Sequence, residues 1–250
     1  MKGRILTSLL AVIAITGLQA QETPAVPRLV VGLTIDQLNM DYVEAFADMF
    51  GERGFKRLWR EGRVYRNAEY NFNQVDRSSA VAAIYTGTTP HVNGIVGNAW
   101  MDRTSLQVVN CVDDTRFMGI YTSESTSPSR LAVSNLSDEL IVATKGTAEV
   151  YSIAPTREMA VLAAGHASQG AFWINDETGK WSGSTYYGTF PSWVSNYNDR
   201  QGLDFRISDM TWSPYLPVSI YRYLTSEVKQ VTFKHKFNDE RKNKYRKLKT

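Results

Sequence analysis

The chain has 250 residues, with 28 Lys and Arg against 25 Asp and Glu, and a single cysteine. A nearly balanced charge argues against a nucleic-acid-binding protein, because such proteins carry a strongly basic face. One cysteine excludes an intrachain disulfide bond. The length suffices for one sizeable domain with a hydrophobic core.

Residues 1–20, MKGRILTSLLAVIAITGLQA, are typical of a secretory signal peptide. Lys2 and Arg4 precede an apolar run, and Ala20 supplies the small residue of a cleavage-like site. The run is too short for a stable membrane span, so we expect none after its removal. An uncleaved N-terminal anchor is the alternative. We therefore expect a periplasmic or secreted protein whose domain begins at residue 21.

Helix-like and strand-like patterns alternate along the chain. The apolar run over residues 29–35, LVVGLTI, predicts a strand buried on both faces of a parallel sheet. Further strands are predicted over residues 64–70 and 148–154, and a β-hairpin over 172–182 around the turn NDETG. Helices are predicted over residues 40–49, 54–61, 78–85, 137–146, 156–164 and 191–199. This order predicts a layered α/β fold with a mostly parallel sheet.

The segment 75–98, VDRSSAVAAIYTGTTPHVNGIVGN, contains the first candidate site. Its small-residue helix begins at Ser78 and Ser79, so free backbone N–H groups and the positive end of the helix dipole favour an anion such as phosphate. The alternative is that the two serines only cap a buried helix.

A second candidate, Asp36, directly follows the first predicted strand. Ligand crevices in α/β sheets lie beyond the carboxyl ends of the strands, where a carboxylate can bind a metal ion. The alternative is a helix N-cap, because a helical pattern begins a few residues later.

The last stretch, residues 234–249, reads KHKFNDERKNKYRKLK and is strongly basic. A nucleic-acid-binding arm is one interpretation. The interspersed Asp239 and Glu240 and the helix-compatible spacing favour a solvated helix instead, so we expect no nucleic-acid binding.

Several motifs occur in one order: LVVGLTIDQ, GFKRLWREG, IYTGTTPHVNGIVGN, SNLSDELIVAT, and VLAAGH followed by AFWIND. In this order they resemble the alkaline phosphatase superfamily. They are similar to the secreted phosphate-irrepressible alkaline phosphatases and to the type I phosphodiesterase and nucleotide pyrophosphatase family. The resemblance covers residues 29–199 and implies an alkaline-phosphatase-like layered α/β/α fold, here incomplete at its C-terminal side.

The resemblance implies a metal-dependent hydrolase of phosphoric esters, a phosphomonoesterase or phosphodiesterase that acts on a phosphorylated small molecule. In such enzymes a Thr or Ser at the helix start attacks phosphorus, and two zinc ions bind the nucleophile and the leaving oxygens. Asp36 matches the first metal ligand. Asn98 matches the side chain that hydrogen-bonds a phosphate oxygen.

The chain departs from this pattern at the nucleophile. A gapless count to Asn98 places Arg77 at that position, and a guanidinium cannot attack phosphorus. Ser78, one residue on, is the candidate displaced nucleophile, although one step along a helix turns a side chain by about 100°. Arg77 remains able to bind phosphate bidentately.

A second departure follows the strand predicted over residues 148–154. The resemblance implies a Lys and an Arg that hold phosphate oxygens, but Thr156 and Glu158 occupy their positions. Arg157 between them is a further candidate for substrate binding.

The family's remaining Asp and His metal ligands are missing. Only His91, His166 and His235 occur, and we interpret His91 as a loop residue and His166 as a structural hydrogen-bonder. We therefore predict an N-terminal part of an alkaline-phosphatase-like domain, inactive alone. The alternative function is a non-catalytic member that binds anionic ligands or a protein partner.

Overall fold

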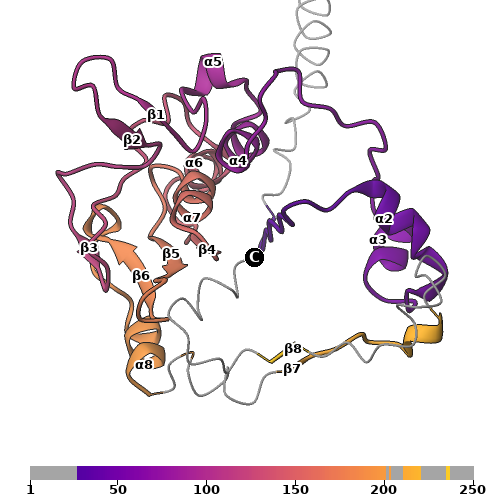
Figure 1. Cartoon of the computed structure of the whole chain (residues 1–250). Coiled ribbons are helices and arrows are strands. Elements are labelled where there is room, and N and C mark those ends of the chain that lie inside the picture. The colour runs from indigo at the N-terminus through magenta and orange to yellow at the C-terminus, as the bar shows by residue number, and fades with distance from the viewer. Residues whose placement is uncertain (1–26, 201–202, 204–210, 221–234, 237–250) are drawn as a thin grey trace, which may run out of the picture. The chain divides into compact units, whose positions relative to one another are not determined.

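The computed structural model describes residues 27–200, 203, 211–220 and 235–236 (Figure 1). The chain divides into two units, residues 1–33 and 34–250. Of the first unit, residues 27–33 are described and contain no helix or strand. The signal peptide predicted over residues 1–20 lies outside the described residues. The second unit contains all the described secondary structure.

The described helices of the second unit are short. The α-helices are α2 Met40–Ala45, α3 Phe55–Glu61, α4 Arg77–Thr86, α5 Pro90–Asn93, α6 Leu136–Ala143, α7 Arg157–Ala164 and α8 Ser192–Arg200, and the 3-10 helices are η1 Ala47–Met49, η2 Thr185–Tyr187 and η3 Val218–Ile220. The helices predicted within residues 54–199 are present with small shifts of their ends, whereas the one predicted over residues 40–49 is divided at Phe46 into α2 and the 3-10 helix η1. No helix in the described part of the chain is both long and apolar enough to span a membrane.

A mixed sheet of four strands has the order β3-β6-β5-β4. Its strands are β3 Gly119–Ile120, β4 Tyr151–Ala154, β5 Gly170–Ile174 and β6 Trp181–Ser184. β4 and β5 are parallel, whereas β6 is antiparallel to both β5 and β3. Two small antiparallel pairs accompany it: β1 Ala99–Met101 with β2 Val108–Asn110, and β7 Thr211–Trp212 with β8 His235–Lys236. The predicted α/β class is confirmed, and the described sheet is mixed rather than mostly parallel.

The predicted hairpin is formed by β5 and β6, and helices cover both faces of the sheet. Phe172 and Trp173 are neighbours on β5 that point to opposite faces, yet they are only 3% and 1% exposed. On one face, Trp173 joins a core cluster with residues of α7. On the other, the Phe172 ring lies 5.4 Å from that of Trp193 on α8. The predicted α/β/α layering therefore holds around β5.

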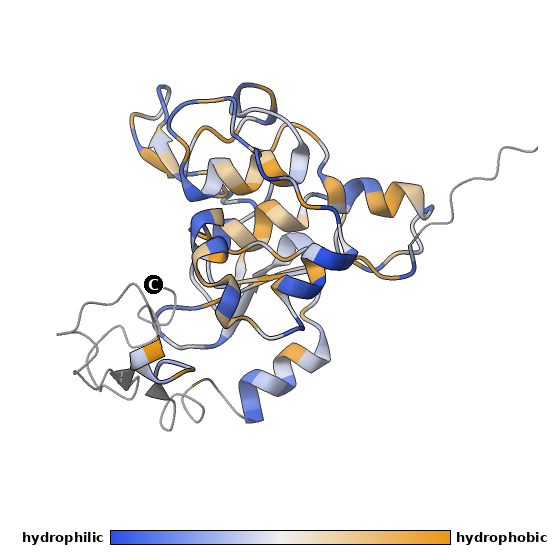
Figure 2. Cartoon of the chain, turned by 90° about the vertical axis from the view of Figure 1, so that its right-hand side faces the viewer, coloured by the Kyte–Doolittle hydropathy of each residue, from blue (hydrophilic) through white to orange (hydrophobic). Residues whose placement is uncertain are grey.

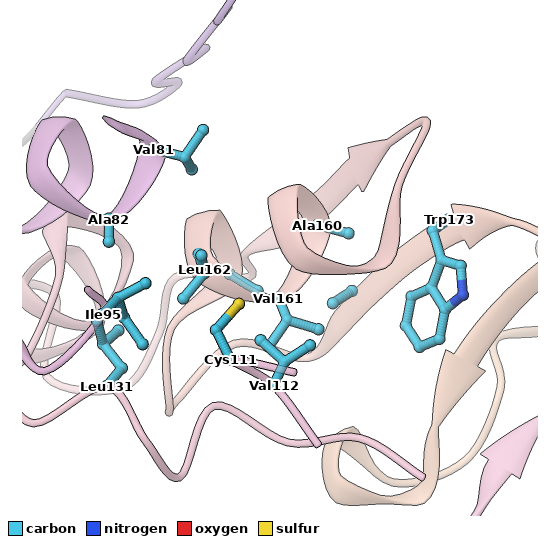
Figure 3. Packing of buried hydrophobic residues seen from close by; sticks show 12 residues of the cluster. Val81, Ala82, Ile95, Cys111, Val112, Leu131, Ala160, Val161, Leu162 and Trp173 are labelled. Carbon is cyan, nitrogen blue, oxygen red and sulfur yellow. The ribbon is translucent and has the colours of Figure 1, made fainter. Parts of the chain in front are cut away.

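The hydrophobic core lies between α4, α7 and the sheet, as Figure 3 shows. Leu162 and Val161 of α7 are fully buried, and Ala82 of α4 packs in the same cluster. Cys111, the single cysteine, lies close to Val112 in this core (Figure 3). The helices carry both hydrophobic and hydrophilic residues (Figure 2), as expected where one helical face packs on a core.

Two strand predictions are wrong within the described residues, and the helix predicted at the C-terminus is absent at the two of its residues that are described. Residues 29–35 and 64–70 form no strand, and Leu29 and Leu33 are 79% and 81% exposed. A β-branched run becomes a strand only against a neighbouring strand, and no described strand pairs with either segment. His235 and Lys236 belong to a strand, not a helix, while the rest of the predicted basic helix lies outside the described residues.

Candidate functional site

Asp76 begins helix α4 as its N-cap residue. Its Oδ1 accepts a hydrogen bond from the backbone N–H of Ser79 at 2.8 Å, and the Ser79 hydroxyl oxygen accepts one from the backbone N–H of Asp76 at 3.0 Å. This reciprocal pair is a capping box. The alternative that Ser78 and Ser79 cap the helix holds for Ser79, which is the N3 partner in the box, whereas the N-cap residue is Asp76 and Ser78 has no part in the box. Sequence reasoning missed Asp76, although an Asp directly before a helical pattern is itself an N-cap signal.

The second oxygen of Asp76 holds the loop that contains Asn98. Asp76 Oδ2 accepts a hydrogen bond from the backbone N–H of Asn98 at 2.6 Å. A Cβ atom on Gly97 would lie 3.1 Å from the same oxygen, so a residue without a side chain suits this close approach. The sequence predicts an anion at the start of this helix, and in the structure the Asp76 carboxylate of the protein itself takes that place.

Ser78 points into the interior from the first turn of α4. Its side chain is fully buried, and its hydroxyl donates a hydrogen bond to Asn98 Oδ1 at 2.8 Å. Burial raises the pKa of the nearby Cys111 thiol to about 12, against the opposing effect of a hydrogen bond with Ser78. The thiol is therefore un-ionised at neutral pH. The structure brings Ser78 and Asn98 together, but only Asn98 is exposed.

Arg77 points the other way and contacts Asp36. Arg77 Nε donates to Asp36 Oδ2 at 2.6 Å, and the two side chains are 41% and 36% exposed. Both line a groove of about 520 Å³, whose charged lining residues are Asp36, Asp76 and Arg77. The other residues that line it are mostly apolar: Thr34, Ile35, Gln37, Leu38, Tyr70, Val75, Ala80, Val81, Ile84 and Met159. This groove therefore combines one guanidinium and two carboxylates with an apolar wall.

Arg157, the first residue of α7, lies in a separate cavity. Its side chain is 9% exposed, and Nη1 lies 3.0 Å from Asp113 Oδ1. Its Nε lies 3.8 Å from a carboxylate oxygen of Glu124 and 3.8 Å from one of Glu158. The structure therefore does not bring Arg157 to the groove that contains Arg77.

The neighbours of Arg157 that occupy the expected phosphate-binding positions are engaged or buried. Glu158 Oε1 accepts a hydrogen bond from the Asn110 side chain at 2.7 Å. The Thr156 hydroxyl is buried and has no hydrogen-bond partner among the described residues. Neither side chain offers a positive charge to a phosphate group.

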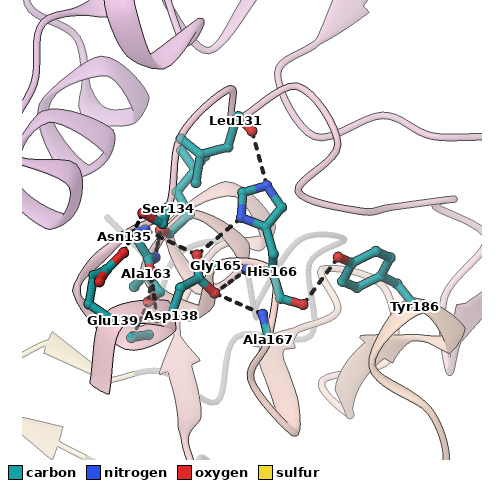
Figure 4. A network of polar contacts seen from close by, with 12 residues as sticks. Leu131, Ser134, Asn135, Asp138, Glu139, Ala163, Gly165, His166, Ala167 and Tyr186 are labelled. Carbon is teal, nitrogen blue, oxygen red and sulfur yellow. Dashed lines mark hydrogen bonds and ion pairs between the residues drawn. The ribbon is translucent and has the colours of Figure 1, made fainter. Parts of the chain in front are cut away.

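His166 ties the end of α7 to the start of α6. Its Nδ1 lies 3.0 Å from Asp138 Oδ2, and its Nε2 lies 3.0 Å from the carbonyl oxygen of Leu131 (Figure 4). The Tyr186 hydroxyl donates to the His166 carbonyl oxygen at 3.1 Å. These contacts agree with the structural role predicted for His166. His91, predicted in a loop, is an exposed residue of the four-residue helix α5.

The described residues do not fit a zinc centre. Structural and catalytic zinc sites use three or four His, Cys, Asp or Glu ligands around one ion. No group of three or more such side chains occurs in the part of the chain that the structure describes. Asp36, the predicted ligand, has Oδ2 bonded to Arg77, and both oxygens of Asp76 accept backbone N–H groups. No chemical step is therefore assigned to a metal ion.

Comparison with known proteins adds an independent observation. Residues 30–246 match the family described as Type I phosphodiesterase / nucleotide pyrophosphatase. The chain is 35% identical over 219 residues to alkaline phosphatase PhoV of Synechococcus elongatus, which covers 85% of the chain and 40% of that protein. It is 34% identical over 221 residues to alkaline phosphatase PafA of Elizabethkingia meningoseptica, with the same two shares.

A solved structure is also similar. The crystal structure of wild-type alkaline phosphatase PafA superposes with a TM-score of 0.74 at 33% sequence identity, covering 79% of this chain and 39% of that one. The chain thus spans about two fifths of the length of these relatives.

Proposed function

The chain belongs to the type I phosphodiesterase / nucleotide pyrophosphatase family, and on this premise we propose that the protein binds the phosphoryl group of small phosphoric esters beside helix α4. The relatives named above are alkaline phosphatases, so the family is one of phosphoric ester hydrolases. The observation that supports the proposal most directly is Arg77, whose guanidinium lines an open groove at the helix start.

Arg77 has the geometry of a phosphate ligand. One N–H of its guanidinium is bonded to Asp36, and the remaining donors have no protein partner among the described residues. A guanidinium binds phosphate oxygens through two parallel charge-assisted hydrogen bonds. The pair with Asp36 orients the guanidinium plane before a ligand arrives, which reduces the entropy lost on binding.

Asn98 is the second proposed contact. Its Oδ1 accepts from Ser78, so the Nδ2 amide group is directed away from Ser78 and is left to donate. Asn98 does not itself line the groove that contains Arg77, but its backbone N–H is bonded to Asp76, and Asp76 does line that groove. Ser78 thus fixes the side chain of Asn98 and Asp76 fixes its backbone, so the Nδ2 amide group is positioned to donate to one oxygen of a phosphoryl group.

The groove suggests an ester with an apolar substituent. Leu38, Val81, Ile84 and Met159 contribute to its wall, and its volume of about 520 Å³ fits a small organic molecule. When the phosphoryl group of an ester is bound to Arg77, its organic substituent can pack against these apolar side chains. Aryl and alkyl phosphates are therefore the proposed ligand class.

Hydrolysis is the second candidate function, and family membership supports it. Ser78 is the proposed nucleophile, since its hydroxyl lies beside Asn98. Because Ser78 is fully buried, attack on phosphorus requires the first turn of α4 to open. The resemblance implies two zinc ions for such a reaction, but Asp36, the ligand that it implies, is paired with Arg77 in the described residues. Hydrolysis by the whole protein is a proposal, and the described residues alone do not assemble this site.

The proposed location is periplasmic or secreted. This proposal rests on residues 1–20, where two basic residues precede an apolar run and a small-residue cleavage-like site. Fractionation of cells that express the chain tests it, because a cleaved signal peptide leaves the protein outside the cytoplasm and shortened at its N-terminus.

Calorimetric titration with phenyl phosphate tests binding. Arg77→Ala is expected to raise the dissociation constant by about tenfold or more, because it removes two charge-assisted hydrogen bonds. Arg57→Ala is the matched control, since Arg57 is an exposed arginine paired with Glu61 outside the groove. Equal affinities of the wild type and Arg77→Ala would overturn the proposed contact.

Turnover of 4-nitrophenyl phosphate and bis(4-nitrophenyl) phosphate separates binding from hydrolysis. Release of 4-nitrophenol that disappears in Ser78→Ala supports the displaced nucleophile. Release that persists in Ser78→Ala contradicts it, and binding without any release supports the non-catalytic alternative.

A further inference from the structure

We infer that Arg77 supplies at Asp36 the positive charge that a metal ion would supply there, so that this chain binds phosphoric esters without zinc. The inference rests on the proposed function and adds to it the nature of the cation in the site. It starts from one contact, the 2.6 Å bond between Arg77 Nε and Asp36 Oδ2.

This contact and a zinc ion compete for the same oxygen. A charge-assisted N–H···O bond is commonly about 2.7–2.9 Å long, so the 2.6 Å contact between Arg77 and Asp36 is slightly shorter than this range. A zinc ion binds a carboxylate oxygen at about 2.0–2.2 Å. A zinc ion on Oδ2 would therefore lie against the guanidinium, and two positive charges at that separation repel each other.

The neighbouring groups in the groove do not replace Asp36 as ligands. Both oxygens of Asp76 accept backbone N–H groups, one from Ser79 and one from Asn98. The cation nearest to Asp36 is thus covalently part of the chain.

The helix start explains why Arg77 takes this place. Arg77 is the first residue of α4 and Ser78 the second, so their side chains diverge by about 100°. Ser78 is held inward by Asn98, which directs Arg77 to the groove and to Asp36. An arginine at this position gives a fixed positive charge that no chelator can remove.

Zinc binding decides the inference directly. Wild-type protein and Asp36→Asn are dialysed against zinc, and bound metal is measured by elemental analysis and by calorimetric titration. Equal zinc content is expected, because Asp36 holds Arg77 rather than a metal ion. Asp41→Asn serves as the control for loss of one exposed carboxylate outside the groove. Stoichiometric zinc in the wild type that is lost only in Asp36→Asn would overturn the inference.

Ligand binding gives the second measurement. The affinity of the wild type for phenyl phosphate is expected to agree within about twofold with EDTA and with added zinc. A loss of about tenfold in EDTA that zinc restores would overturn the inference. Absence of phenyl phosphate binding in both media would overturn the proposed function instead, while the zinc comparison would still decide the role of Arg77.

Discussion

The hydroxyl of Ser78 donates a hydrogen bond to the side-chain oxygen of Asn98 at 2.8 Å. The candidate nucleophile and the candidate phosphate ligand therefore hold each other, although 20 residues separate them. Because Ser78 is fully buried, this bond also satisfies a hydroxyl that has left water. The same contact fixes which way the first turn of α4 faces, and so where Arg77 points.

The Ser78–Asn98 bond is expected to stabilise the fold. Asn98→Ala leaves the buried hydroxyl without its acceptor, which should lower the free energy of unfolding by about 1–3 kcal/mol. Ser78→Ala and the double variant complete a thermodynamic cycle, measured by urea unfolding. The double variant should lose less stability than the sum of the single losses. Strict additivity would contradict a direct interaction between the two side chains.

Asp76 is expected to matter more for stability than an ordinary N-cap. Asp76→Ala removes the cap of α4 and the acceptor of the Asn98 backbone N–H, so a loss of about 2–3 kcal/mol is expected in urea unfolding. Asn39→Ala is the matched control, because Asn39 caps the six-residue helix α2 with one exposed bond. A loss in Asp76→Ala no larger than in Asn39→Ala would contradict the bridging role.

The pair of His166 and Asp138 predicts a pH dependence of stability. The hydrogen bond with Asp138 raises the pKa of His166, although burial opposes it. Burial alone would raise the pKa of Asp138, but the hydrogen bond from His166 and the backbone N–H groups together lower it. The histidine contribution is full below about pH 6.5 and is lost as the pH rises through the raised pKa. The carboxylate contribution is full above about pH 4 and is lost as the pH falls through the lowered pKa.

Melting temperatures of the wild type and His166→Gln test this dependence. The wild type should exceed the variant by more at about pH 5.5 than at about pH 8.5, because the imidazolium is lost at the higher pH. His91→Gln is the control, since His91 is exposed on α5. A difference that grows toward high pH would contradict a raised pKa of His166 in the folded protein.

Elements with strong local signals could be predicted from the sequence. The hairpin turn is one case: Asn175 Oδ1 accepts the backbone N–H groups of Glu177 and Thr178, and Gly179 has a φ of 66°. All the residues that form these hydrogen bonds lie within five positions of one another, so the residue types alone are enough to predict the turn. The run over residues 29–35 has strong strand propensity but no partner strand among the described residues, and propensity without pairing misled the prediction.

The site could be predicted only in part, because its contacts join distant segments. The segment that contains Ser78 and Asn98 was found from its residue pattern, and the structure brings these two side chains together. The partner of Arg77 was not found, since Asp36 lies 41 residues away and nothing local links them. The sequence predicts Arg157 in the same site, but in the structure its guanidinium pairs with Asp113 and Glu124. These residues lie more than 30 positions before Arg157 in the sequence, so only the folded chain brings them close to it.

The charge of the groove predicts a preference between ester classes. Asp36 and Asp76 against Arg77 leave a formal charge of −1 on the lining. A phosphodiester has one negative charge, whereas a monoester gains a second with a pKa of about 6. Diphenyl phosphate should therefore bind more tightly than phenyl phosphate at about pH 8. The difference in affinity should be smaller at about pH 5.5, because the monoester then carries mostly one negative charge. Calorimetric titration at both pH values measures it, and tighter binding of the monoester at the higher pH would contradict the charge argument.

Arg157 is expected to support the fold rather than the ligand. Its nearly buried guanidinium is surrounded by the carboxylates of Asp113, Glu124 and Glu158, so Arg157→Met leaves their charges uncompensated. Removing one partner of a buried ion pair costs about 3–5 kcal/mol, and the partial exposure of these carboxylates places the expected loss at about 2–3 kcal/mol.

The matched pair of variants separates the two roles. Arg157→Met should unfold at a lower urea concentration than the wild type, yet its dissociation constant for phenyl phosphate should agree with that of the wild type within about twofold. Arg77→Ala should unfold at the same urea concentration as the wild type but bind phenyl phosphate more weakly. Arg157→Gln keeps the length and polarity of the side chain and should recover part of the stability. A loss of phenyl phosphate affinity in Arg157→Gln, with unchanged stability, would instead assign Arg157 to substrate binding, the role that the sequence predicts for it.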